Sequence, residues 1–228
     1  MSGTSPASPM SDFLPRFPDH EVVIGPLQRS EAMFMYSLVM VLRPRRIVEL
    51  GFYRGDSCSA LAAAASEMNR LTEDPTNHAT VESYDIRVSP ENARSVQEKY
   101  PGTRIEVMDQ RDVHKVEGGE IDFLFIDAAH DLEVNKATWR NIEAKLSANA
   151  VVMVHDTGLW VDAHRPSTIG RQGETGVARN VHGCFHQPEE VAFVKWIVNI
   201  YPMWVKMDFI SINTFRHGFT LLQRALHV

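Results

Sequence analysis

The chain has 228 residues, of which 44% are hydrophobic and 23% are charged, and this composition excludes a disordered, collagen-like or disulfide-scaffold protein. Its 23 basic and 29 acidic residues give a net charge of −6, which argues against a broad phosphate-binding surface and predicts no nucleic-acid partner. The two cysteines lack metal-site or redox spacing and predict a reduced, cytoplasmic protein. The longest apolar run, residues 33–42, is far shorter than the ~20 residues of a membrane span, so we expect no membrane association.

The N-terminal residues 1–9 are rich in Ser and Pro, and they lack the basic and apolar segments of a signal peptide. We therefore expect residues 1–20 to form a disordered or loosely held tail. The remaining residues, 21–228, have the length of one α/β domain and contain no repeat or convincing internal boundary.

Residues 27–42 predict a helix ahead of the first strand. Its Met33, Tyr36 and Met40 lie on one helical face, which we expect to pack against a sheet. The same methionine-rich face leaves open two other roles: the wall of a substrate pocket, or the contact of a homodimer or higher homo-oligomer.

Short β-branched or apolar runs then alternate with segments of helical length and character. The predicted strands are residues 46–50, 80–84, 103–108, 121–126 and 150–154, and the helices between them are residues 57–69, 90–100 and 132–146. Runs that are apolar on both faces are typical of a parallel sheet covered by helices on both sides. This alternation predicts a doubly wound α/β fold.

The last part of the chain begins with a long irregular segment, residues 158–187, which we expect to be a functional or mobile loop. Trp160 is a candidate aromatic wall of the substrate site, and three histidines of the segment are either surface residues or, for at least one of them, part of that site: His164, His182 and His186. A helix at 188–201 and two closing strands at 205–212 and 218–224 follow. The complete prediction is a mostly parallel, seven-stranded, Rossmann-like sheet with helices on both faces.

Acidic side chains follow four of the predicted strands directly: Asp85, Asp109, Asp127 and Asp156. The first strand ends instead at Gly51. In open α/β sheets, ligands bind outside the carboxyl ends of the strands. One acid at a strand end can simply start a turn or cap a helix, but four at successive strand ends predict one crevice lined with carboxylates.

The first turn, residues 48–57, has two glycines that permit a tight turn and the close approach of a ligand, Gly51 and Gly55. Tyr53 stands where the dinucleotide fingerprint has its second glycine, and no Gly-Lys-Ser/Thr follows, so neither phosphate-binding motif is present. Ser57 is placed to cap the next helix. The acid before the turn, Glu49, suits a cationic ammonium group, and the later Asp85 suits the hydroxyls of a ribose. S-adenosylmethionine carries both groups.

The sequence Glu49-Leu50-Gly51-x-Tyr53-x-Gly55-x-Ser57 resembles motif I of class I S-adenosylmethionine-dependent methyltransferases, and it is closest to the form in catechol O-methyltransferases. Residues 121–130 and 151–157 are similar to the metal-dependent O-methyltransferases and their relatives, which include cephalosporin-hydroxylase-like and sugar O-methyltransferase groups of antibiotic pathways. The resemblance covers residues 46–157. It implies the methyltransferase fold and a set of cofactor-binding residues: Glu49, Gly51, Tyr53, Gly55, Ser57, Asp85, Ile86, Asp109, Gln110 and Asp127.

The resemblance also implies a divalent metal held by carboxylates that end the fourth and fifth strands, which here are Asp127 and Asp156. Oxygen ligands favour Mg²⁺. The family usually has Asp-Asn at the second place, whereas this chain has Asp156-Thr157 preceded by His155. We expect His155 as a third ligand, which would move the preference towards Mn²⁺ or another transition metal. In the alternative, the two aspartates only cap a helix and hold a turn.

His130 stands where the catechol-type family carries a lysine base, so it is the predicted catalytic residue; the alternative is a polar residue at a helix start. These features predict an O-methyltransferase acting on a small molecule with vicinal hydroxyls, either a catechol or a sugar, in natural-product biosynthesis. Two other functions stay open. The first is a metal-independent methyltransferase with His130 or His155 as base, and the second is a catalytically silent accessory subunit.

Overall fold

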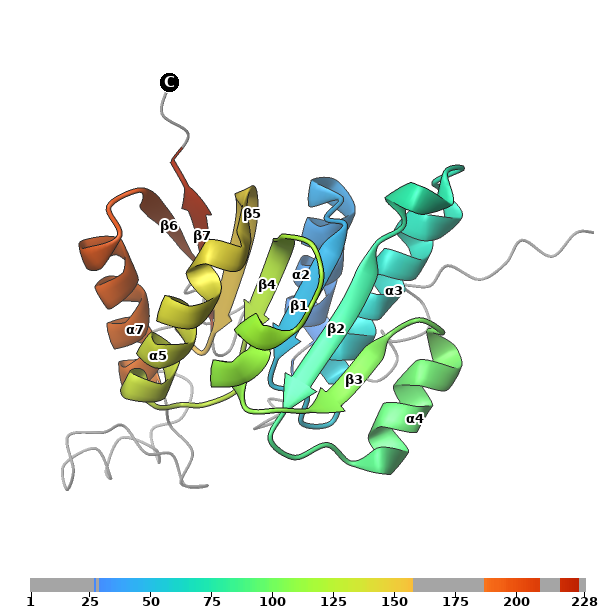
Figure 1. The fold of residues 1–228 in the computed structure, drawn as a ribbon, viewed down its shortest axis with the longest axis horizontal. Helices are drawn as coiled ribbons and strands as arrows, with labels where there is room; N and C mark the ends of the chain where they lie inside the picture. The colour runs from blue at the N-terminus through green and yellow to red at the C-terminus, as the bar shows by residue number, and fades with distance from the viewer. Residues whose placement is uncertain (1–26, 28, 158–186, 210–217, 226–228) are drawn as a thin grey trace, which may run out of the picture.

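The computed structural model describes residues 27, 29–157, 187–209 and 218–225. Within them lies one seven-stranded sheet with the strand order β3-β2-β1-β4-β5-β7-β6 (Figure 1). Its strands are β1 (Arg46–Leu50), β2 (Thr80–Asp85), β3 (Arg104–Val107), β4 (Ile121–Ile126), β5 (Leu146–His155), β6 (Trp204–Phe209) and β7 (Phe219–Arg224). The predicted tail at 1–20 and nearly all of the predicted loop at 158–187 lie outside the described residues.

The sheet is mostly parallel, as the alternation of strands and helices predicts. Neighbouring strands from β3 through β5 run parallel, whereas β7 pairs antiparallel with both β5 and β6. The strand order therefore reverses between β1 and β4, which is where open α/β sheets form their ligand crevice.

Helices cover both faces of the sheet, as predicted. They are α2 (Arg29–Leu42), α3 (Asp56–Arg70), α4 (Pro90–Lys99), α5 (Leu132–Ile142) and α7 (Gln187–Ile200), with short 3₁₀ turns η2 (Pro75–Asn77), η3 (Gln110–Lys115) and η4 (Glu143–Lys145). Side chains of α2, α3 and α4 share one hydrophobic cluster, and those of α5 and α7 share the other. Strand β4 supplies both clusters, because Phe123 and Phe125 point to the first and Leu124 and Ile126 to the second.

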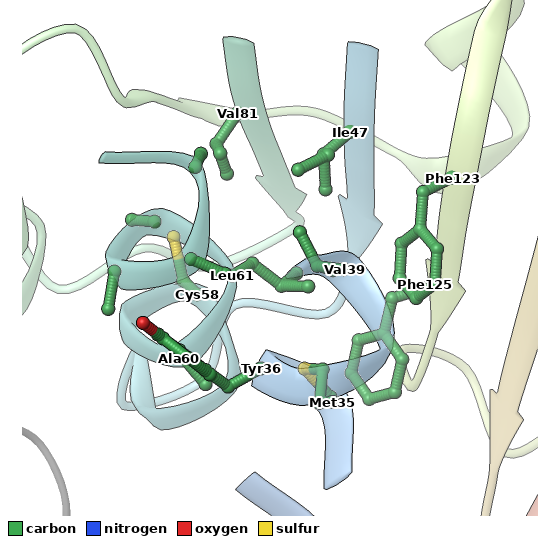
Figure 2. Close-up of a cluster of buried hydrophobic side chains, with 14 of the residues drawn as sticks. Met35, Tyr36, Val39, Ile47, Cys58, Ala60, Leu61, Val81, Phe123 and Phe125 are labelled. Carbon is green, nitrogen blue, oxygen red and sulfur yellow. The ribbon is translucent and has the colours of Figure 1, made fainter. Parts of the chain in front are cut away.

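The buried face of α2 differs from the predicted one. Met35, Tyr36 and Val39 are buried against α3 and the sheet (Figure 2), whereas Met33 is 39% exposed. The prediction that Met33 packs on the sheet is therefore wrong. The spacing of Met35, Tyr36 and Val39 places all three side chains on one stripe of α2, and this stripe packs into the core.

Two of the helices begin with a side chain that caps the helix N-terminus. Ser89 accepts a hydrogen bond from the Asn92 amide at the start of α4, and Asp131 accepts one from the Val134 amide at the start of α5. The predicted helix at 132–146 ends earlier, at Ile142, and β5 begins at Leu146. Among the described helices, none combines the length and the apolar character that crossing a membrane requires.

Candidate functional site

The turn after β1 joins the turn after β4 at the point where the strand order reverses. Gly51 has φ +108°, and a Cβ added to it would lie 2.2 Å from the Asp127 carbonyl oxygen. The sequence attributes this glycine to the close approach of a ligand, but the structure shows that the backbone of Asp127 already requires it. Gly55 adopts φ +82° as the N-cap of α3. Gly51 thus fixes the predicted turn against the end of β4, whereas a Cβ at Gly55 would meet the side chains of Phe52 and Val96.

Glu49 is a fully buried carboxylate beneath this turn. It accepts hydrogen bonds from Ser83 of β2 and from Ser57. Ser57 lies in the first turn of α3, which Gly55 caps, so the predicted capping role of Ser57 is wrong. Burial, the largest cause, raises the pKa of Glu49 to about 7, although the hydrogen bonds from Ser57 and Ser83 oppose the change.

The second oxygen of Glu49 fits a cationic ligand group. Its Oε1 atom is buried and has no hydrogen-bond partner within the described part of the chain. A buried polar atom without a partner is costly, and an ammonium group supplies both a donor and a compensating charge. The residue therefore fits the ammonium end of S-adenosylmethionine.

Asp85 connects the first turn to the turn after β2. Its carboxylate accepts hydrogen bonds from the Tyr53 amide at 3.0 Å and from the Arg87 amide at 2.9 Å. Tyr53 and Ile86 beside it are 62% and 64% exposed. The structure thus brings together the predicted ribose-binding acid and two exposed side chains at the carboxyl edge of the sheet.

Two of the predicted cofactor-binding residues, Asp109 and Gln110, have different environments. The hydrogen bond and ion pair from Arg111 lower the pKa of Asp109 to about 2, and Asp109 also starts η3. Gln110 is buried, and its side-chain amide donates to Asn135 and Thr138 of α5 and accepts from the Ala129 amide. The Gln110 side chain thus ties η3 to α5 and to the turn after β4, and its polar atoms are already hydrogen-bonded within the fold.

The two acids that end β4 and β5 come together with a histidine. Asp127, His130 and Asp156 each offer a ligand atom, and these atoms all lie within 4.8 Å of one another. All three side chains are partly exposed. Asp156 has φ +61°, a left-handed conformation that aspartate tolerates better than most residues. The chemistry of this donor set, two carboxylates and an imidazole, fits a divalent cation.

His155 lies behind the carboxylates, outside that donor group. Its buried ring packs near Phe219 and Phe125, with centroids 4.9 and 6.2 Å away. Its Nδ1 atom lies 3.1 Å from Asp127 Oδ2, and its Nε2 atom lies 3.6 Å from Glu31 Oε1. Both ring nitrogens therefore face carboxylates already, and the group of potential ligand atoms within 4.8 Å of one another contains His130 where the sequence predicts His155. Thr157 is buried, 2.9 Å from the Thr220 hydroxyl, so it also faces into the fold.

Two glutamates of this site, Glu31 and Glu190, were not among the predicted residues. Both are buried; Glu31 faces His155, and Glu190 Oε1 lies 2.7 Å from His130 Nδ1. A signal was present in the sequence, because each acid lies on the apolar stripe of its helix. Glu31 shares a stripe with Met35 and Val39, and Glu190 precedes Phe193 by three positions.

The site concentrates negative charge. With four carboxylates (Glu31, Asp127, Asp156 and Glu190) and two histidines (His130 and His155), the fully ionised cluster has a net charge of −2. Burial raises the pKa of Asp156 to about 6 and that of Glu190 to about 7. Burial lowers the pKa of His130, but the Glu190 hydrogen bond and the nearby acids outweigh it and raise that pKa to about 9. Bound protons thus neutralise part of a charge that a divalent cation could also neutralise.

Comparisons with known proteins point to a methyltransferase domain. A family model described as a methyltransferase domain matches residues 48–157. An uncharacterized Sinorhizobium fredii protein, y4gI, is 36% identical over 141 residues, which are 54% of this chain but only 15% of that much longer protein.

Solved methyltransferases share the fold over nearly the whole chain. The Bacillus cereus O-methyltransferase in complex with S-adenosylhomocysteine is 16% identical, with a TM-score of 0.57 over 99% of this chain and 93% of that one. The S-adenosylhomocysteine-bound Podospora anserina methyltransferase PaMTH1 is 21% identical, with a TM-score of 0.58 over 99% and 91%. The Streptomyces achromogenes O-methyltransferase TomG, in complex with S-adenosylmethionine, is 16% identical, with a TM-score of 0.58 over 97% and 92%.

Proposed function

We propose that this chain is a class I S-adenosylmethionine-dependent methyltransferase that transfers the methyl group to a hydroxyl oxygen of a small molecule. The observation that carries the proposal is the convergence of Asp127, His130 and Asp156 beside the Gly51 turn. In this proposal, the three side chains serve acid–base chemistry or cation binding next to the turn that would hold the methyl donor.

The proposed cofactor site follows the carboxyl ends of β1, β2 and β3. Glu49 would receive the ammonium group, Asp85 the ribose hydroxyls, and Asp109 with the backbone of Gln110 the adenine. Because the sulfonium of S-adenosylmethionine is itself an activated methyl donor, the protein needs only to align the acceptor oxygen and remove its proton. Tyr53 and Ile86 are exposed beside Asp85, where they could cover the adenosine.

Asp127 and Asp156 are the proposed metal ligands, with His130 as the third group. Mg²⁺ suits the carboxylates, whereas an imidazole ligand favours Mn²⁺ or a later metal. When bound, such a cation would lower the pKa of an acceptor hydroxyl. Vicinal hydroxyls, as in a catechol or a sugar diol, fit a site that must orient one oxygen beside its neighbour. TomG takes part in tomaymycin synthesis, and an acceptor of the natural-product type is part of the proposal.

A second candidate is a metal-independent methyltransferase in which His130 accepts the proton. The observation that favours it is the short contact between His130 Nδ1 and Glu190 Oε1, 2.7 Å, which would stabilise a protonated imidazole. In this candidate, Asp127 and Asp156 hold the imidazolium instead of a metal.

Isothermal titration and a chelator assay test both candidates. We expect S-adenosylhomocysteine to bind, and we expect the purified enzyme to methylate 3,4-dihydroxybenzoate, a simple catechol probe. Treatment with EDTA should remove the activity and added Mg²⁺ or Mn²⁺ should restore it. Full activity after EDTA, unchanged by added metal, would favour the metal-independent candidate. Absence of S-adenosylhomocysteine binding would contradict both.

Asp156→Ala separates chemistry from cofactor binding. We expect this variant to bind S-adenosylhomocysteine nearly as well as the wild type and to lose turnover by two or more orders of magnitude, because it removes a group that acts on the acceptor side. Glu67→Ala is the matched control, since Glu67 pairs with Arg70 in the last turn of α3, at the opposite edge of the sheet. Equal turnover in Asp156→Ala and Glu67→Ala would contradict the site assignment.

A further inference from the structure

The first turn of α7 supplies a carboxylate to the histidine of the proposed site. We infer that Glu190 is a positioning residue, which fixes the ring orientation of His130 by accepting the Nδ1 proton. The inference rests on the proposed function insofar as it assigns His130 to the reaction. It concerns a residue from a different part of the chain, 60 positions away.

The distances single out Glu190 among the acids near His130. Glu190 Oε1 lies 2.7 Å from His130 Nδ1, whereas the nearest Asp156 oxygen lies 3.8 Å from the same atom. Only the first is a hydrogen-bonding distance. A carboxylate that accepts the Nδ1–H hydrogen bond orients the opposite edge of the imidazole, which carries Nε2, towards the group on which the ring acts. This is the arrangement by which outer carboxylates set the tautomer of a catalytic or metal-binding histidine.

Burial argues against a merely incidental contact. The Glu190 side chain is only 5% exposed, and its other oxygen, Oε2, has no hydrogen-bond partner among the described residues. Burying a carboxylate on an apolar helical stripe destabilises a fold unless the carboxylate is paired and hydrogen-bonded. Within the described residues, His130 is the side chain to which the Glu190 carboxylate is hydrogen-bonded.

The helix that carries Glu190 is held firmly against the turn that carries His130. The preceding residue, Glu189, accepts a hydrogen bond from the Leu132 amide at 3.2 Å. Below it, Phe193 packs edge-on against Trp139 of α5, with ring centroids 6.2 Å apart. The Glu190 carboxylate therefore sits on a helix that is hydrogen-bonded and packed against α5, as a positioning role requires.

Three variants test the inference: Glu190→Ala, the isosteric Glu190→Gln, and the matched control Glu189→Gln, which removes the charge of Glu189 but keeps an oxygen acceptor for the Leu132 amide. The direct readout is the His130 Nδ1–H proton in ¹⁵N-histidine-labelled protein, assigned by its loss in His130→Asn. In the wild type and Glu189→Gln we expect a downfield, slowly exchanging resonance, because the proton is held by a carboxylate. It should disappear in Glu190→Ala and move upfield in Glu190→Gln, whose amide is a weaker acceptor.

Turnover of 3,4-dihydroxybenzoate is the second readout. We expect kcat to fall roughly 10- to 100-fold in Glu190→Ala, with an unchanged KM for S-adenosylmethionine, and to recover partly in Glu190→Gln. An unchanged Nδ1–H resonance in both Glu190 variants would overturn the inference, as would an equal loss of kcat in Glu189→Gln. A wild type that binds no S-adenosylhomocysteine and methylates no catechol contradicts the proposed function instead. The proton resonance still decides whether Glu190 positions His130.

Discussion

Glu49 shows how one buried group makes the stability of this protein depend on pH. Burial raises its pKa from 4.5 to about 7 in the folded chain. The folded state therefore prefers the protonated form, and the contribution of Glu49 to the free energy of unfolding falls as the pH rises from about 4.5 to about 7, then stays constant. When no ligand is bound, Glu49 therefore destabilises the folded state at neutral pH.

Glu49→Gln should remove this part of the pH dependence. Between pH 5 and pH 8 we expect the free energy of unfolding of the wild type to drop relative to the variant by about 3 kcal/mol at most, from the size of the pKa shift. Urea unfolding at the two pH values measures it, with the exposed Glu98→Gln of α4 as a control that should follow the wild type. Identical pH profiles for wild type and Glu49→Gln would show that Glu49 is ionised in the folded chain.

Asp85→Ala should weaken cofactor binding without stopping the chain from folding. The carboxylate holds the Tyr53 and Arg87 amides and is the proposed partner of the ribose hydroxyls. Loss of hydrogen bonds to a charged group costs about 1.5–3 kcal/mol, so we expect the Kd for S-adenosylhomocysteine to rise about 10- to 100-fold. Isothermal titration measures the Kd, and Asp74→Ala, at the start of η2, is the control. Equal affinities in the two variants would remove Asp85 from the cofactor site.

The element-scale feature that forms the crevice is the contact between the turns after β1 and β4. Gly51 and Gly102 both have positive φ, +108° and +97°, but only Gly51 has neighbours that an added Cβ would meet. The pair thus separates backbone strain from steric overlap, since Gly102 has nothing within 4 Å of an added Cβ.

Gly51→Ala should destabilise the fold far more than Gly102→Ala. We expect Gly102→Ala to cost about 1–2 kcal/mol, the strain of a left-handed L-residue. Gly51→Ala should cost several kcal/mol more, because its Cβ would overlap the Asp127 carbonyl and force β1 and β4 apart. Urea unfolding of both variants measures the difference. Similar losses in the two would show that the turn can move away from β4.

For helices and strands alike, the sequence predicted the positions of the elements better than it predicted which of their side chains are buried. The strands at Arg46–Leu50 and Ile121–Ile126 match the prediction because β-branched and apolar runs between turn residues have few alternative structures. The burial of Met35 instead of Met33 was missed, because a helix with apolar residues on several sides offers more than one stripe, and the sheet selects among them.

At the scale of the whole molecule, the site is a concentration of negative charge at one edge of the sheet. Four carboxylates and two histidines come from α2, the ends of β4 and β5, the turn before α5, and α7. Since like charges brought together in a buried site destabilise one another, a bound divalent cation should stabilise the whole fold.

Saturating Mn²⁺ or Mg²⁺ should therefore raise the Tm. At a metal concentration 100 times its Kd, linkage gives about 2.7 kcal/mol, which corresponds to a rise of about 5–10 °C for a domain of this size. Asp156→Asn should abolish the rise, and Glu67→Gln should keep it. Thermal unfolding with and without metal measures the effect. A wild-type Tm that neither metal changes would favour the metal-independent candidate.

The sequence by itself determined the alternation of elements, the parallel order of most of the sheet, and the acids at successive strand ends. Those features are local, since a strand or turn follows from neighbouring residues. Only the tertiary structure decided that His130 joins Asp127 and Asp156 while His155 lies behind them, and that Glu31 and Glu190 complete the cluster. Contacts between residues 60 positions apart depend on how α7 packs on α5, and that packing is the combined result of side chains over the whole chain.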